Sequence, residues 1–180
     1  VPIGKGGMIA VLGSDIKTLE SLINKLDKNG VCEIANDNSV GQIIVSGDII
    51  SINSFKKLLD DTKIKNIPLP VSAPFHCSLM QKASKDMEEK INSIKFLKPE
   101  IPIVANVTAK EEIDSDTIKN LLVKQIFSKV RWRESMEFMS NSGINTFIEV
   151  GPGKVLTGLA KRIVKDKKII NINEIKNLEL

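Results

Sequence analysis

The first 71 residues alternate between short apolar runs and stretches with a helical period, and this order limits the folds open to the chain. Residues 8–13, 31–36 and 42–47 (MIAVLG, VCEIAN and QIIVSG) have the length and composition of buried or half-buried strands. Residues 65–71 predict one more strand, and two prolines in it favour a sheet edge or an irregular strand. Four strands are therefore expected in this part.

Two helical stretches separate these strands. The first is expected to begin at Asp15 or the serine before it and to end near Lys28, and the second to run from an Asp48 cap to about Asp61. The resulting order, strand-helix-strand-strand-helix-strand, is a ferredoxin-like βαββαβ plan. We therefore expect an α/β protein with a ferredoxin-like subdomain at residues 4–70, preceded by a glycine-rich linker. This plan hosts many unrelated functions, so it predicts none.

The chain beyond residue 71 alternates strands with longer helical stretches. Strands are expected at 101–108, 145–150 and 168–173. The helices expected near them start at about Leu79, Ser115, Trp132 and Val155. Such alternation favours a mainly parallel sheet. With only about three strands in view, we expect an incomplete sheet that leaves apolar surface uncovered.

The only histidine, His76, lies where a constrained loop meets a predicted helix. Pro74 disfavours helical geometry in the residue before it, whereas a helical period begins at Leu79. Imidazole exchanges protons near neutral pH, so His76 is a candidate acid or base; the alternative is an ordinary loop histidine. Cys77 is a weak candidate nucleophile, because adjacent residues rarely direct their side chains at each other.

Three segments resemble the malonyl-CoA:acyl-carrier-protein transacylases, the loading enzymes of fatty acid synthesis. Residues 70–80 (PVSAPFHCSLM) resemble the catalytic-histidine segment, and residues 147–163 resemble a C-terminal segment with a G-P-G-K signature. Residues 35–47 resemble an N-x-N-S-x-x-Q segment, with the motif positions Asn36, Asn38, Ser39 and Gln42. The segments follow the family's order and approximate spacing, and the resemblance covers nearly the whole chain.

The resemblance implies roles for four residues. His76 would be the general base and acid, and Gln125 would lend its backbone carbonyl to orient the imidazole. Asn36, on a turn facing the cleft, would contact the bound acyl thioester. Phe75 matches the malonyl-selecting form and would crowd an α-methyl branch. For Asn36 a self-stabilised hairpin turn, and for Gln125 an exposed helical position, remain the alternatives.

Parts of the family's machinery are absent from this sequence. There is no G-x-S-x-G nucleophile elbow. The resemblance also implies an upstream arginine for the malonyl carboxylate and a glutamine for the oxyanion hole. We therefore interpret the chain as the C-terminal part of a longer enzyme, with residues 71–180 forming the C-terminal part of an α/β-hydrolase-like acyltransferase subdomain. By itself it is expected to be inactive.

The function implied by the resemblance is transfer of a malonyl group from coenzyme A to the phosphopantetheine thiol of acyl carrier protein. The coenzyme A thioester would be a substrate, with no covalently bound cofactor and no metal. The implied partners are malonyl-CoA, acyl carrier protein and the missing N-terminal part of the enzyme. The implied compartment is the bacterial cytoplasm or a plastid-type organelle, and secretion is not expected.

Composition leaves one different class of function open. The net charge of +4 suits an acidic partner, which makes a non-catalytic ferredoxin-like module for RNA or an acidic protein the alternative. One Trp and no Tyr argue against an RNA-stacking surface. No apolar run is long enough to predict a membrane span. Lys161, Arg162 and Lys165 suggest either a solvated helix face or a contact with an acidic carrier protein.

Overall fold

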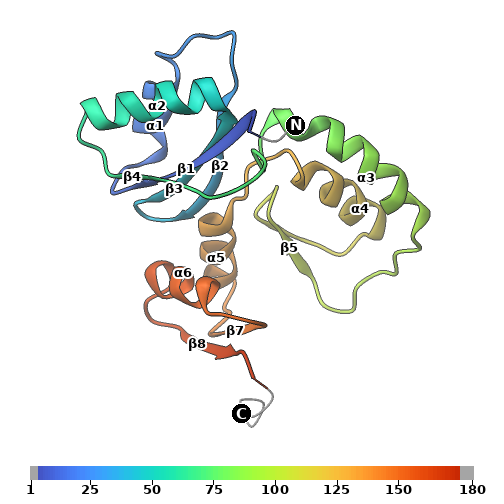
Figure 1. The fold of residues 1–180 in the computed structure, drawn as a ribbon. Coiled ribbons are helices and arrows are strands. Elements are labelled where there is room, and N and C mark those ends of the chain that lie inside the picture. The colour runs from blue at the N-terminus through green and yellow to red at the C-terminus, as the bar shows by residue number, and fades with distance from the viewer. Residues whose placement is uncertain (1–3, 175–180) are drawn as a thin grey trace.

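The structure is a computed structural model that describes residues 4–174, and its elements form three groups along the chain (Figure 1). The first group is a four-stranded sheet with the order β2-β3-β1-β4, in which all neighbouring strands are antiparallel. Its elements are β1 (Gly6–Leu12), α1 (Ile16–Ile23), β2 (Cys32–Ser39), β3 (Gln42–Asp48), α2 (Ile49–Asp61) and β4 (Asn66–Pro68). The predicted order of six elements is therefore confirmed.

Helices α1 and α2 cover one face of this sheet (Figure 1). The core between them consists of alternate residues of β1 and β3 and the apolar faces of both helices. Its fully or largely buried members are Ile9, Val11, Leu19, Leu22, Ile43, Val45, Ile52, Phe55 and Leu59. Both helices begin at the expected caps, because Asp15 accepts a hydrogen bond from the Thr18 N–H and Asp48 one from the Ser51 N–H.

Three boundaries differ from the sequence-based expectation. Gly6 and Gly7 belong to β1 instead of a flexible linker, since they pair with β3. β2 continues to Ser39, three residues past the expected end at residue 36, so Asn36 lies inside a strand and not on a turn. α1 ends at Ile23, and the chain then continues in tighter turns that keep Leu26 packed on the core. Each difference reflects tertiary pairing or packing that a local pattern does not contain.

The second group contains the helix pair α3 and α4, which lie side by side (Figure 1). Its elements are the short 3-10 helix η1 (Ser78–Met80), α3 (Gln81–Ser93), β5 (Ile103–Ala105), β6 (Lys110–Glu112) and α4 (Ser115–Gln125). The strand expected at 101–108 is limited to Ile103–Ala105. A tight turn between Ala105 and Ala109 then leads directly into β6, which pairs with β5.

The third group is a parallel strand pair joined by a helix. Its elements are α5 (Trp132–Asn141), β7 (Thr146–Val150), α6 (Val155–Ile163) and β8 (Lys168–Ile172). Met136, Ala160 and Val164 form its buried centre.

The expected mainly parallel sheet is wrong for the described residues. β5 and β6 form a separate antiparallel hairpin, and only β7 and β8 pair in parallel. Apolar side chains do remain exposed, among them Ile101, Val150 and Val155, each more than 70% accessible. None of the helices within residues 4–174 combines the length and apolar character needed to cross a lipid bilayer.

Candidate active site

His76 adopts a left-handed backbone conformation, with φ of 60°, in the loop before η1. Non-glycine residues rarely take this conformation, although histidine does so more often than most. The imidazole Nδ1 lies 2.9 Å from the backbone carbonyl oxygen of Gln125. A carbonyl oxygen can only accept, so Nδ1 carries the proton and Nε2 is left with a free lone pair. This is the tautomer that a general base requires.

Gln125 reaches His76 because it is the last residue of α4. Carbonyl groups in the last turn of a helix have no helical N–H partner, so they are free to accept other donors. The other end of α4 is capped by Asp114, whose carboxylate accepts from the Thr117 N–H at 2.8 Å. The structure therefore brings His76 and Gln125 together in the arrangement that the sequence led us to expect, through a main-chain group.

The segment 126–131 that follows Gln125 runs onto the first sheet at Asn36. The Val130 N–H donates to the Ala35 carbonyl at 2.8 Å, and the Asp37 N–H donates to the Val130 carbonyl at 2.9 Å. Asn36 thus lies in a bridge with Val130, at a point where the pairing of β2 with β3 shifts register. Such bulges redirect a strand's side chains, so the structure places Asn36 beside the segment that begins at Gln125.

Phe75 precedes His76 and is 41% exposed. Its backbone N–H donates to the Ala73 carbonyl at 3.1 Å, so the turn is held before the histidine. An aromatic residue left this exposed is available for contact with a bound group.

Neither cysteine has the character of a nucleophile. The Cys77 thiol is fully buried and donates to the Pro74 carbonyl, and its burial raises its pKa. Burial likewise raises the pKa of Cys32 to about 12. Since the thiolate is the reactive form, both side chains are inert near neutral pH.

Segment 126–131 also holds the β5–β6 hairpin, through Arg131. Its backbone N–H donates to the Asn106 carbonyl at 3.0 Å, and its guanidinium donates to the Thr108 carbonyl at 2.9 Å. The guanidinium also pairs with Glu134 and keeps the pKa of that carboxyl below its usual range. No sequence motif indicates this role for Arg131, because the contact depends on the β5–β6 hairpin, which local pattern does not predict.

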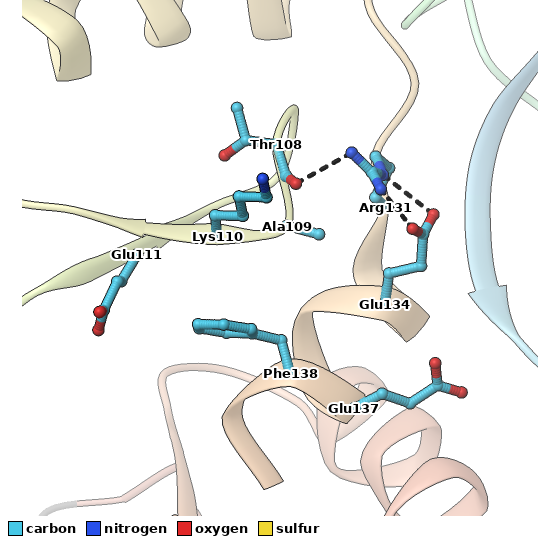
Figure 2. Close-up of a pocket in the computed structure, with 8 residues that line it drawn as sticks. All are labelled: Thr108, Ala109, Lys110, Glu111, Arg131, Glu134, Glu137 and Phe138. Atoms are coloured by element: carbon cyan, nitrogen blue, oxygen red, sulfur yellow. Dashed lines mark hydrogen bonds and ion pairs between the residues drawn. The ribbon is translucent and has the colours of Figure 1, made fainter. Parts of the chain in front are cut away.

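Figure 2 shows the hollow of about 530 Å³ beside Arg131. It is lined by Thr108, Ala109, Lys110, Glu111, Arg131, Glu134, Glu137 and Phe138. None of the four residues singled out from the sequence lies in it, so it is distinct from the His76 site. Within residues 4–174 there is also no cluster of three or more His, Cys, Asp or Glu side chains placed to hold a metal ion.

No protein-family model matches this chain. Individual known proteins, however, resemble it in both sequence and structure. The malonyl CoA-acyl carrier protein transacylase of Bacillus subtilis strain 168 is 36% identical over 182 residues, covering 100% of this chain and 57% of the relative.

Two solved structures are similar throughout. The acyl-carrier-protein-S-malonyltransferase of Bartonella henselae has a TM-score of 0.95 at 40% identity, covering 99% of this chain and 57% of that one. A malonyl-transacylase solved in complex with its type II polyketide acyl-carrier protein has a TM-score of 0.94 at 33% identity, covering 99% and 58%.

In fold and in sequence the chain is similar to α/β acyltransferases. More particularly, it is homologous to the C-terminal part of the malonyl CoA-acyl carrier protein transacylases. It spans 57% of the length of the Bacillus relative that it matches.

Proposed function

We propose that this chain is the C-terminal part of an enzyme that transfers a malonyl group from coenzyme A to the phosphopantetheine thiol of acyl carrier protein, in fatty acid biosynthesis. The observation that carries the proposal is the His76–Gln125 contact, which leaves Nε2 as a base of fixed orientation. The nucleophile would be a serine supplied by a part of the enzyme outside this sequence.

In the first half-reaction, Nε2 of His76 accepts the serine hydroxyl proton while the serine oxygen attacks the thioester carbonyl. The carbon–sulfur bond breaks, and the imidazolium returns the proton to the departing coenzyme A sulfur. In the second half, Nε2 takes the proton of the carrier thiol, whose sulfur attacks the acyl-serine. The ester carbon–oxygen bond breaks, and the proton passes to the departing serine oxygen. The Gln125 carbonyl stabilises each imidazolium by accepting its Nδ1–H, as a carboxylate does in other triads.

Asn36 and Phe75 are proposed to contact the acyl thioester. The Asn36 side chain can offer both a hydrogen-bond donor and an acceptor. Its bridge to Val130 places it next to segment 126–131, which follows Gln125. The exposed ring of Phe75 is proposed to crowd an α-methyl branch, and one methyl group in a pocket is worth about 1–3 kcal/mol of discrimination. A malonyl group would therefore be preferred over methylmalonyl.

Residues 4–70 are proposed to be a ferredoxin-like small subdomain and residues 71–180 the C-terminal part of the large acyltransferase subdomain. The antiparallel order β2-β3-β1-β4 supports the first assignment, and the parallel β7–β8 pair linked by α6 supports the second.

Acyl carrier protein is proposed as the partner, since a similar malonyl-transacylase has been solved with one. Malonyl-CoA is proposed as a substrate, with no covalently bound cofactor. The bacterial sources of the reported relatives favour the bacterial cytoplasm over a plastid-type organelle. The alternative of a binding module for RNA or an acidic protein is not supported, because the matches to named transacylases span the whole chain.

The test is labelling of the complete enzyme with radioactive malonyl-CoA, comparing wild type with His76→Asn. Asparagine tolerates a left-handed backbone but cannot act as a base, so the loop is kept while the chemistry is lost. We expect a stable acyl-protein in the wild type and labelling slowed about 10²–10⁴-fold in the variant.

Two results would contradict the proposal. Labelling of His76→Asn at the wild-type rate would remove His76 as the base. A correctly folded wild type that never becomes labelled would exclude the acyl-enzyme route.

A further inference from the structure

Glu33 of β2 anchors the residue that lies two positions after His76. One carboxylate oxygen accepts the Ser78 backbone N–H at 3.0 Å, and the other accepts the Ser78 hydroxyl. The two residues are 45 positions apart in the sequence. Hydrogen bonds to an ionised carboxylate are stronger than those between neutral groups, so this double contact fixes the start of η1 on the sheet.

The chain before His76 is fixed on the same sheet by a close contact. A Cβ added to Gly6 of β1 would lie 2.3 Å from Cδ of Pro74, so the proline ring sits directly against the glycine. Pro74 is buried, and its carbonyl accepts the Cys77 thiol at 3.2 Å. The first sheet therefore holds the loop on both sides of His76.

These anchors matter because the backbone of His76 is strained. A left-handed conformation at a bulky residue persists only where its surroundings enforce it. The bond to the Gln125 carbonyl comes from α4, outside the sheet. Releasing Ser78 would allow the loop to relax and would turn the ring away from that carbonyl.

We propose that Glu33 is a positioning residue for His76, which acts through Ser78 to hold the imidazole on the Gln125 carbonyl. Its catalytic consequence rests on the proposed function, whereas its effect on the ring does not. The alternative is that the contact only stabilises the start of η1, in which case its loss would leave the ring's tautomer unchanged.

The first experiment measures the ring directly by ¹⁵N NMR. His76 is the only histidine in the 180 residues, so the chain gives a single imidazole spectrum. We expect a slowly exchanging proton on Nδ1 in the wild type, and its loss with mixed tautomers in Glu33→Ala. Ser78→Ala, a milder change that keeps the backbone N–H, should give an intermediate spectrum.

Two further variants separate positioning from general stability. Glu33→Gln keeps an amide oxygen that can accept the Ser78 N–H and gains an amide N–H that can donate to the Ser78 hydroxyl. This variant should therefore have the wild-type ring spectrum. Glu20→Ala removes an exposed carboxylate of α1 and should leave the spectrum unchanged. A wild-type ring spectrum in both Glu33→Ala and Ser78→Ala would overturn the proposal.

The second experiment measures malonyl transfer by the complete enzyme. We expect Glu33→Ala to lower kcat by roughly tenfold to a hundredfold with KM nearly unchanged, and Glu33→Gln to restore it. An unchanged kcat in Glu33→Ala of an active enzyme would also overturn the proposal. If the ring spectra change as expected but the wild type transfers no malonyl group, the proposed function fails and the positioning role stands.

Discussion

The guanidinium of Arg133 donates to both carboxylate oxygens of Asp37, at 2.7 to 3.1 Å, across 96 positions of sequence. Asp37 belongs to β2 and is 1% exposed, whereas Arg133 belongs to α5 and also contacts Glu137. Asp37 directly follows Asn36, and Arg133 lies three positions after Val130, so the ion pair is next to the Asn36–Val130 bridge. The ion pair therefore helps to hold the first sheet against segment 126–131, which follows Gln125.

Removing the arginine should destabilise the protein strongly, because it leaves a buried carboxylate without a partner. We expect Arg133→Ala to lower the free energy of unfolding by on the order of 3 kcal/mol, measured by urea denaturation. The double variant Asp37→Ala/Arg133→Ala should lose less than the sum of the two single variants. Arg162→Ala, which removes an exposed contact with Gln42, is the control and should cost less than about 1 kcal/mol. Equal losses in Arg133→Ala and Arg162→Ala would contradict this view.

Alanine should have opposite effects at two glycines. Gly6→Ala would place a methyl group against the Pro74 ring, so we expect lower stability and a displaced His76 loop. Gly158 lies inside α6 with open space around it, so Gly158→Ala should stabilise the protein by roughly 0.5–1 kcal/mol. Thermal unfolding of both variants tests this pair, and a Gly6→Ala variant as stable as wild type would show that the proline contact is not tight.

The Asp48 cap should make stability depend on acid pH. Burial acts to raise the pKa of Asp48, but hydrogen bonds from Ser51 and Val31 outweigh it, so the pKa lies below its ordinary value. A lowered pKa in the folded state means that the cap stabilises fully above the unfolded pKa of about 3.9 and is lost as pH falls through the lower folded value.

We therefore expect Asp48→Ala to cost about 1 kcal/mol at pH 7, and this difference from wild type to shrink below pH about 4. Asp48→Asn keeps a capping oxygen that does not titrate, so its stability should fall less steeply in acid than that of the wild type. Urea unfolding from pH 2 to 7 measures both. A pH-independent gap between wild type and Asp48→Ala would argue against an ionised cap.

The two thiols should be protected in the folded chain. With a pKa of about 12, Cys32 should react with iodoacetamide at pH 8 on the order of a thousandfold more slowly than an ordinary thiol. Cys77 should be slower still, because it is fully buried. Mass spectrometry after timed alkylation tests this, with the guanidinium-unfolded chain as the control in which both react. Rapid labelling of the folded chain would mean that the loop around Cys77 opens.

Features set by neighbouring residues were predictable from the sequence. The caps at Asp15 and Asp48 and the order of the first six elements depend on spacing and side-chain type within a few positions. The β5–β6 hairpin was missed because Ala109, with φ of 54°, closes its turn where glycine is the usual signal. The end of β2 differs from the expectation, because its pairing with β3 and with Val130 extends the strand beyond Asn36.

The sequence by itself determined that a lone histidine follows a proline-constrained loop, and its motifs indicated the family. The resemblance pointed to Gln125, but only the tertiary structure shows its carbonyl, 49 positions away, at 2.9 Å from Nδ1 and the Glu33 carboxylate hydrogen-bonded to Ser78. The physical reason is that periodicity and capping act between near neighbours, whereas these bonds join a strand, a loop and a helix end that meet only after folding. A backbone carbonyl, moreover, is the same group in every residue, so neither residue type nor periodicity identifies which carbonyl will be used.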